Sequence, residues 1–220
     1  MYAAIATRPD IAHAVQHLSQ FMSNPSPTHW TAVKRVFRYI NGTRNLGLTY
    51  DGNQPLELVG YADADWGSDP VDRRSISGYV FFLGNNPITW ASRKQRTVAV
   101  SSMEAEYMAA SLAAREAVWL KAFLAQLKLT PDAAITLKLD NQSLIDFITN
   151  QGSHAKSKHI DIAYHFIRER VMDKSIVIEY CPSKDNLADI FTKALPRPAF
   201  ENLVSRIGMV SDLRGSVDNK

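Results

Sequence analysis

The sequence predicts an α/β fold in which helices pack on a mixed β-sheet. Three β-prone segments follow one another at residues 56–63, 76–83 and 87–90, with polar loops or turns between them. Such a succession is typical of an antiparallel meander. Two further strand-like segments, at 135–140 and 175–181, are each preceded by helix-like stretches. Strands joined through helices indicate that the sheet continues beyond the meander and that helices cover it.

The first 50 residues are expected to form a small, self-contained helical segment. Asp10 can cap a first helix, in which Ile11 and Leu18 belong to one apolar face. The prolines within 24–27 end that helix. Thr28 is then expected to cap a second amphipathic helix.

The second half of the chain alternates helices with strands. Ser101 and Ser102 are expected to cap a long helix at 102–128, which is rich in the good helix formers Ala, Leu and Met. The remaining expected elements are a short strand at 46–50 and helices at 141–150, 160–172 and 186–194. The α/β domain itself is predicted at 55–197, and residues 198–220 are expected to form a C-terminal tail.

The composition is that of a soluble globular protein. Hydrophobic residues make up 45% of the 220 residues, and the net charge of +3 is compatible with a polyanionic partner. Cys181 is the single cysteine, which excludes an intrachain disulfide and a cysteine-based zinc site. No apolar run reaches membrane-spanning length, and the start does not resemble a signal peptide. We therefore expect an intracellular protein, cytoplasmic or nuclear.

Carboxylates stand at the ends of several predicted elements. Asp63 ends the opening strand and Asp140 ends the fourth, so the two would converge if these strands are parallel neighbours. Glu106 shares the alanine-rich, sheet-facing side of the long helix, whereas Glu104 falls on a more polar side. Asp189 lies in the first turns of the last predicted helix. Taken alone, the opening strand could simply run into an acidic surface loop.

Four converging carboxylates would repel one another strongly, and no basic residue near Glu106 in the sequence compensates them. Such a cluster is stable around divalent cations, and an all-oxygen ligand set favours Mg²⁺ or Mn²⁺ over zinc. Two such ions about 4 Å apart activate a water and stabilise the leaving oxygen of a phosphodiester. The pattern therefore predicts a metal-dependent nuclease.

Several motifs together resemble one family. They are Tyr61-Ala62-Asp63, Ser77-Gly78-Tyr79-Val80-Phe81, Ser92-Arg93-Lys94-Gln95, Ser101-Ser102-Met103-Glu104-Ala105-Glu106-Tyr107, Leu139-Asp140-Asn141-Gln142, Lys158-His159-Ile160-Asp161, Tyr164-His165-Phe166-Ile167-Arg168-Glu169 and Asp185-Asn186-Leu187-Ala188-Asp189. As a set over about 1–197, they resemble the ribonuclease H domain of copia-type LTR retrotransposon Pol polyproteins. Residues 1–50 resemble the last helices of the reverse transcriptase that precedes it.

The resemblance implies a ribonuclease H-like fold with a five-stranded mixed sheet and hydrolysis of the RNA strand of RNA–DNA hybrids. It implies that Asp63, Glu106, Asp140 and Asp189 are the catalytic and metal-binding residues, with two Mg²⁺ ions and Mn²⁺ as a substitute. Its implied partners are the hybrid and the missing reverse transcriptase portion, in a virus-like particle. Tyr61-Ala62-Asp63-Ala64 lacks the second aspartate of a polymerase Tyr-x-Asp-Asp loop, so no DNA synthesis is expected.

Basic residues for a nucleic-acid substrate flank the Glu106 helix. Arg93, Lys94 and Arg96 precede it and are the best phosphate-binding candidates. Further candidates are Ser102, Asn141 and Lys158, although capping is the simpler role for a serine at a helix start. The tryptophans at 66, 90 and 119 are expected to pack in the core or at its edge.

One departure concerns histidine. Many ribonucleases H carry a histidine in the loop before the last acid, whereas residues 181–189 contain none here. His154, His159 and His165 lie elsewhere, and a structural role is expected for the last two. Product release could therefore be slow.

Three alternatives remain open at this stage. One is a nucleic-acid-binding remnant that is catalytically weak or inactive. Another is an integrase-type nuclease, but its acids would follow the order Asp, Asp, Glu, usually beside a Cys/His zinc module. The last is a protein that its host has recruited for an interaction.

Overall fold

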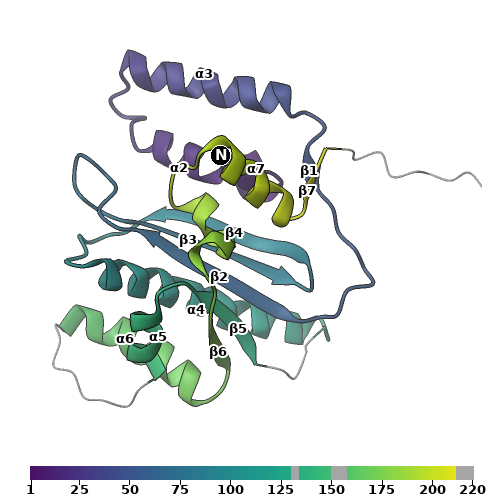
Figure 1. The fold of residues 1–220 in the computed structure, drawn as a ribbon, viewed down its shortest axis with the longest axis vertical. Coiled ribbons are helices and arrows are strands. Elements are labelled where there is room, and N and C mark those ends of the chain that lie inside the picture. The colour runs from purple at the N-terminus through teal and green to yellow at the C-terminus, as the bar shows by residue number, and fades with distance from the viewer. Residues whose placement is uncertain (130–133, 150–157, 212–220) are drawn as a thin grey trace, which may run out of the picture.

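A five-stranded mixed sheet forms the centre of the molecule (Figure 1). The computed structural model describes residues 1–129, 134–149 and 158–211, with side chains for all of these except 158–164. The strands are β2 (Leu58–Asp65), β3 (Ile76–Leu83), β4 (Asn86–Lys94), β5 (Ile135–Leu139) and β6 (Ile176–Tyr180), in the order β4-β3-β2-β5-β6. β2, β3 and β4 form the antiparallel meander, and β5 pairs in parallel with both β2 and β6. The predicted mixed sheet is confirmed.

Strand β3 shows why the sheet is covered on both faces. Its side chains alternate between two cores, as the period of a strand requires. Tyr79 and Phe81 belong to the core beneath the long helix, whereas Val80 and Phe82 belong to the core on the opposite face. A strand buried on both sides reads as a continuous apolar run, which is what the sequence shows here.

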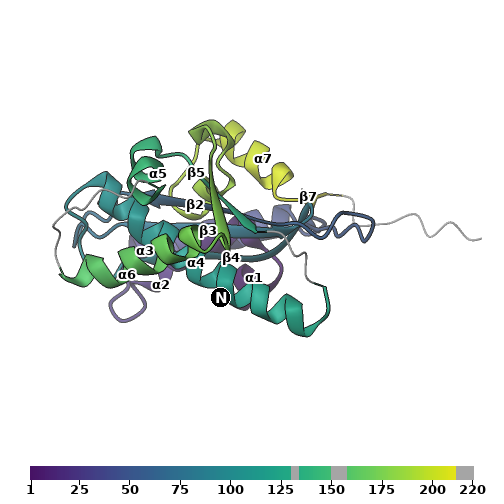
Figure 2. The same cartoon turned by 90° about the horizontal axis from the view of Figure 1, so that it is seen from below.

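Three helices cover one face of the sheet. They are α4 (Ser102–Gln126), α5 (Gln142–Thr149) and α6 (Lys158–Met172). Figure 2 views the molecule from the side of this layer. The side of α4 that faces the sheet carries fully buried alanines at 110, 113 and 117, whose small side chains let the helix approach the strands closely.

The start of α4 is fixed by reciprocal capping. Ser101 Oγ accepts a hydrogen bond from the Glu104 backbone N–H at 3.1 Å, and Glu104 Oε2 accepts one from the Val100 N–H at 2.8 Å. This confirms Ser101 as the cap. The expectation that Glu104 lies on a polar side is wrong, because its carboxylate folds back onto the helix start and is buried.

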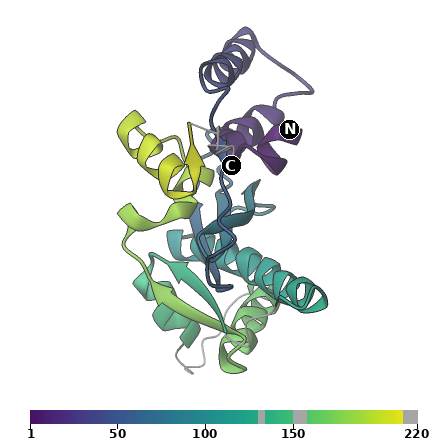
Figure 3. The ribbon, with the colours of Figure 1, turned by 90° about the vertical axis from the view of Figure 1, so that its right-hand side faces the viewer.

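The other face is covered by the two ends of the described chain. The N-terminal elements are α1 (Tyr2–Ala6), η1 (Pro9–Ile11), α2 (Ala12–Ser19) and α3 (Pro27–Gly42), and the C-terminal ones are η2 (Ser183–Asp185), η3 (Leu187–Phe191) and α7 (Arg197–Arg206). Figure 3 shows both groups on the same side of the sheet. Trp90 Nε1 on β4 donates to the Ala4 carbonyl at 2.8 Å, so the N-terminal helices are not self-contained as expected.

Two predicted caps in this layer are wrong. Asp10 lies buried in η1, where it pairs with Arg8 at 2.7 Å and accepts a hydrogen bond from the Tyr39 hydroxyl at 2.8 Å. Ser26, not Thr28, caps α3: its Oγ accepts from the His29 N–H, and its own N–H donates to His29 Nδ1. No side chain caps η1 or α2, whereas at the start of α3 the sequence offered both Ser26 and Thr28.

A small second sheet joins the two ends. β1 (Gly47–Leu48) pairs antiparallel with β7 (Met209–Val210). Part of the region predicted as a tail thus forms α7 and β7. Leu203 and Ile207 are buried in the same core as Val80 and Phe82, on the face of the sheet opposite α4. Within the described residues, no helix combines the length and apolar character needed to cross a membrane.

Candidate metal centre

Three of the four predicted acids meet at one end of the sheet. Asp63 lies near the end of β2, Asp140 directly follows β5, and Glu106 lies in α4. One carboxylate oxygen from each lies within 4.8 Å of the other two. Because β2 and β5 are parallel neighbours, with Tyr61 paired to Lys138, their carboxyl ends bring Asp63 and Asp140 to the same edge. Asp65 lies outside this group and is half-buried.

The fourth acid, Asp189, is anchored beside the group by the segment that carries it. That segment is η3, a 3₁₀ helix rather than the α-helix predicted at 186–194. Asn186 Nδ2 donates to the Ala62 carbonyl at 3.0 Å, and Asn186 Oδ1 caps η3 by accepting from the Ala188 N–H. The buried Asn186 therefore fixes η3 to β2 one residue before Asp63.

A glycine makes the close approach of η3 possible. Gly78 on β3 pairs with Asp63 in the sheet register. A Cβ at this position would lie 2.7 Å from Thr192 Cγ2 and 2.8 Å from Phe191 Cβ. Without the glycine the segment could not pack here, and the Thr192 hydroxyl, which donates to Asp63 Oδ2, would move away.

A lysine that the sequence reasoning missed lies between two of the acids. Lys193 Nζ lies 2.9 Å from Asp189 Oδ1 and 3.8 Å from Asp63 Oδ2. The expectation that no base compensates the cluster is therefore wrong. Its i,i+4 spacing from Asp189 was the signal that could have revealed it.

The pKa values of two of the acids, Asp63 and Glu106, are raised. Burial, the largest cause, and the charges of Asp189 and Asp140 raise the pKa of Asp63 to about 7, although Lys193 and the Thr192 hydroxyl oppose the shift. Burial and the charges of Asp63 and Asp140 likewise raise the pKa of Glu106 to about 9. One lysine therefore does not neutralise the cluster, and negative charge there needs a further cation.

The donor set fits a hard divalent cation. Asp63, Glu106 and Asp140 offer carboxylate oxygens only, at a spacing that could hold a metal ion, and their charge is under-compensated. Within the residues that the structure describes, no other group of three or more acids, histidines or cysteines converges in this way.

An open cleft of about 660 Å³ lies between β4 and α4. Arg93 and Arg96, both predicted phosphate-binding residues, are exposed and line it. Arg115, which sequence reasoning did not propose, lines it from α4. Three guanidinium groups around one cleft give it a positive charge that suits a phosphate backbone.

The other predicted nucleic-acid contacts fare differently. Ser102 is exposed at the start of α4. Asn141 Oδ1 accepts from the Leu144 N–H at 3.0 Å and so caps α5. The side chain of Lys158 lies outside the described residues, as does that of His159, and His154 lies outside them entirely. His165 is exposed on α6.

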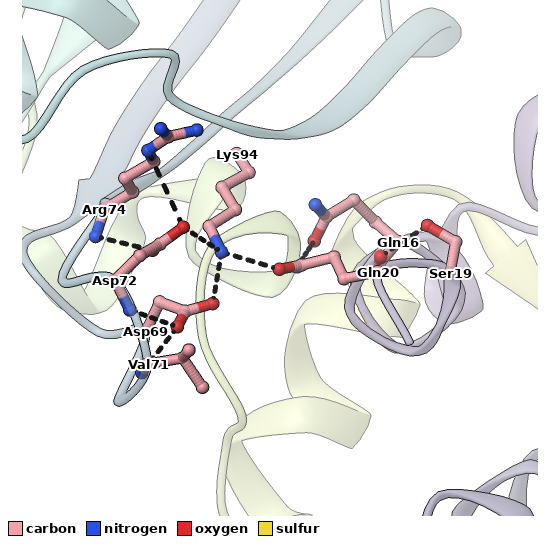
Figure 4. A network of polar contacts seen from close by, with 8 residues as sticks. All are labelled: Gln16, Ser19, Gln20, Asp69, Val71, Asp72, Arg74 and Lys94. Carbon is pink, nitrogen blue, oxygen red and sulfur yellow. Dashed lines mark hydrogen bonds and ion pairs between the residues drawn. The ribbon is translucent and has the colours of Figure 1, made fainter. Parts of the chain in front are cut away.

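Lys94 has partners within the chain (Figure 4). Its Nζ lies 2.6 Å from Asp69 Oδ2 and 2.9 Å from Asp72 Oδ2, and it donates to Gln20 Oε1 at 2.9 Å. The ammonium is therefore committed to the loop that follows β2 and to the end of α2. We do not retain Lys94 as a phosphate ligand, because binding a phosphate would leave the buried Asp69 without a cation.

The tryptophans also differ from one another. Trp66 Nε1 donates to the Ala99 carbonyl at 3.1 Å, and Trp90 contacts α1 as described above. Trp119 is 56% exposed and stacks on Phe123 with ring centroids 5.3 Å apart. The expectation that Trp119 packs in the core is wrong, since it points away from the alanine-rich side of α4.

Similarity to known proteins identifies the family. No family model matches the chain. The chain is 44% identical over 212 residues to the retrovirus-related Pol polyprotein from transposon TNT 1-94 of Nicotiana tabacum. The aligned region covers 96% of this chain and 16% of that protein. The chain is 40% identical over 203 residues to the corresponding protein from transposon RE1 of Arabidopsis thaliana, covering 92% and 14%. Over most of its length, this chain is homologous to a segment of the retrovirus-related Pol polyproteins of plant transposons.

The chain spans about one sixth of the length of these relatives. Among solved structures, LC11-RNase H1 in complex with an RNA/DNA hybrid is similar with a TM-score of 0.46 and 16% identity, covering 66% of this chain and 98% of that chain. The family resemblance predicted from the motifs is thus confirmed by the Pol polyproteins themselves.

Proposed function

We propose that this segment of a Pol polyprotein is a metal-dependent endonuclease that hydrolyses the RNA strand of RNA–DNA hybrids. The observation that carries the proposal is the convergence of Asp63, Glu106 and Asp140 within 4.8 Å in a chain of this family. A ribonuclease H role in reverse transcription follows from the motifs around these acids.

Asp63, Glu106 and Asp140 would hold Mg²⁺ or Mn²⁺, with Asp189 at the side of the site; the resemblance implies two ions. When bound, the metal would supply a nucleophilic water and stabilise the charge that develops on the phosphate. The chain supplies fixed carboxylates for it: Asp63 is held by the Thr192 hydroxyl, and Glu106 by the capped helix α4. Preorganised ligands of this kind need little rearrangement during the reaction.

The substrate would be positioned by the guanidinium-lined cleft. Arg93 and Arg96 face solvent beside α4, whose second turn carries Glu106. Contacts to phosphates set the register of a nucleic acid without reading its sequence. We propose that Ser102 at the start of α4 and Asn141 before α5 contact sugar or phosphate groups.

The proposal is tested with a labelled RNA–DNA hybrid, and with double-stranded DNA as the control substrate. We expect the protein to cut the RNA strand of the hybrid with Mg²⁺ and to lose this activity with EDTA. The Asp140→Asn variant keeps the shape of the side chain but removes its charge, and it should be inactive. An intact RNA strand, or equal cutting by Asp140→Asn, would refute the proposal. Tight hybrid binding without cutting would instead select the non-catalytic remnant.

A further inference from the structure

The ammonium of Lys193 lies on one side of the acidic group. It contacts Asp189 at 2.9 Å and approaches Asp63 to 3.8 Å. The side chains of Asp63 and Asp189 are only 3% and 13% exposed, whereas that of Lys193 is 37% exposed. The lysine therefore reaches from the surface into a largely buried pair of carboxylates.

The turn after η3 holds this arrangement in place. The Lys193 backbone N–H donates to the Asp189 carbonyl at 3.3 Å, so the lysine and the acid lie one turn apart. Thr192, between them in the same turn, donates through its hydroxyl to Asp63 and also to the Asp189 carbonyl. The main chain thus directs Lys193 toward both acids from a segment that is itself bound to β2 through Asn186.

This contact divides the four acids into two sets. Asp63, Glu106 and Asp140 form the convergent group, and Asp189 is paired with Lys193. A divalent ion shared by Asp63 and Asp189 would have to displace the ammonium, since two cations cannot occupy the same few ångströms without strong repulsion. The convergent group can accept an ion while Lys193 stays in place.

We propose that the ammonium of Lys193 occupies the Asp63–Asp189 side of the metal centre and competes there with a second divalent ion. The free protein then binds one divalent ion tightly, at Asp63, Glu106 and Asp140, and a second ion only when Lys193 moves aside. This inference rests on the proposed function, because it concerns the same site. Lys193 is a positioning residue. It reduces the repulsion between Asp63 and Asp189, and it directs the first ion to the group of Asp63, Glu106 and Asp140.

The test measures metal binding by the whole chain without any nucleic acid. Mn²⁺ is titrated by calorimetry, with electron paramagnetic resonance to count bound ions. We expect one tight site in the wild type and a second site at least about tenfold weaker. Lys193→Gln should strengthen the second site about tenfold or more and alter the first much less, because the ammonium contacts Asp189 more closely than Asp63.

Matched variants separate this effect from a general loss of charge. Lys184→Gln removes an equal charge from an exposed lysine in the same region and should leave both sites unchanged. Lys193→Arg keeps the charge and should retain the wild-type pattern. Adding Asp189→Asn to Lys193→Gln should abolish the gained second site. The melting temperature of each metal-free variant shows whether it is folded.

The outcomes distinguish this inference from the function on which it rests. Two equally tight sites in the wild type, or a second site that Lys193→Gln leaves unchanged, would overturn the role of Lys193 but leave the nuclease proposal intact. If Asp140→Asn fails to weaken the first site, the metal centre itself is wrong and both proposals fall.

Discussion

Two acidic clusters, one that includes Asp63 on strand β2 and one in the loop that follows this strand, differ in how their charge is balanced. In one, Asp69 and Asp72 share Lys94, and the backbone N–H groups of Val71 and Asp72 donate to Asp69 (Figure 4). In the other, Asp63 and its neighbours face a single partly exposed lysine. The first cluster is saturated by the chain itself, whereas the second is not.

The pKa values of the two clusters shift in opposite directions. Burial would raise the pKa of Asp69, but Lys94 and two backbone hydrogen bonds lower it overall, and the pKa of Asp72 is lowered mainly by Lys94. Burial raises the pKa of Asp63 to about 7 and that of Glu106 to about 9. Acids that a protein balances internally hold its structure together, and acids that it leaves unbalanced are available to a ligand.

The largest difference should appear in catalysis, and α4 offers a matched pair of acids. Glu106→Gln removes a convergent carboxylate and should reduce hybrid cleavage about 1000-fold, which corresponds to ~4 kcal/mol of transition-state stabilisation. Glu104→Gln changes a residue two positions away and should leave cleavage within about twofold, since the Gln side-chain oxygen can still accept the hydrogen bond from the Val100 N–H. Single-turnover cleavage of a labelled hybrid measures both. Equal loss in the two variants would mean that the helix, not the charge, matters.

The sequence was enough to predict the convergent acids. Asp63 and Asp140 lie near the ends of two predicted strands, and their convergence depended on a parallel pairing that only the structure shows. Glu106 followed from the helical period of the alanines. These are local patterns that repeat along one element. The structure places Asp63, and not the nearby Asp65, in the convergent group.

The long-range contacts that balance the charge could not be predicted, although the i,i+4 spacing of Lys193 from Asp189 indicated that one local pair. Lys94 meets Asp69 across 25 positions and Gln20 across 74, and Lys193 meets Asp63 across the whole α/β domain. Periodicity assigns a side chain to a face of its own element but does not tell which distant side chain it meets. The burial of Glu104 and the exposure of Trp119 were missed because helical periodicity does not describe contacts outside the helix. Glu104 is buried where its side chain folds back onto the helix start, and Trp119 lies on a turn that faces solvent.

The saturated cluster should respond to loss of its lysine through stability. Lys94→Met leaves Asp69, whose side chain is 3% exposed, without a cation and should cost about 2 kcal/mol. At roughly 2–4 °C for each kcal/mol, the melting temperature should fall by several degrees. Adding Asp69→Asn should recover part of the loss, since the two residues are coupled. If thermal denaturation shows two additive losses instead, the pair does not interact as described.

The pH dependence of stability should have opposite signs in the two clusters. The folded protein binds more protons than the unfolded chain at Asp63 between its ordinary pKa of 3.8 and about 7. It does the same at Glu106 between 4.5 and about 9. Their contribution to stability is therefore complete at low pH and is lost as the pH rises through those folded values. Asp69 and Asp72 contribute stability above their ordinary pKa of 3.8, and this is lost in more acidic solution.

Melting curves in EDTA from pH 5 to pH 9 isolate the effect of the convergent acids, because the contribution of Asp69 and Asp72 is lost only in more acidic solution. Glu106→Gln should gain stability relative to the wild type as the pH rises, by roughly 2–4 °C for each kcal/mol regained. Saturating Mg²⁺ should remove the gap by stabilising only the wild type, through RT ln(1 + [L]/Kd). A gap that does not vary with pH would show that Glu106 is not protonated in the metal-free protein.

The smallest effect should come from the cleft outside both clusters. Arg93→Ala should weaken hybrid binding about threefold to tenfold and reduce the slope of log affinity against log salt by about 1. Arg197→Ala removes an exposed arginine paired with Glu201 on α7 and should change neither quantity. Fluorescence anisotropy at several salt concentrations, with EDTA to prevent cleavage, measures both. Identical slopes for the two variants would exclude the cleft as a phosphate site.

Anomalous scattering from Mn²⁺-soaked crystals would test the contrast between the two clusters most directly. A strong anomalous peak should lie between the carboxylates of Asp63, Glu106 and Asp140, and none should lie at Asp69 and Asp72, which Lys94 already neutralises. The absence of a peak among the three convergent acids, or a peak beside Lys94 instead, would contradict the assignment of this site as the metal centre.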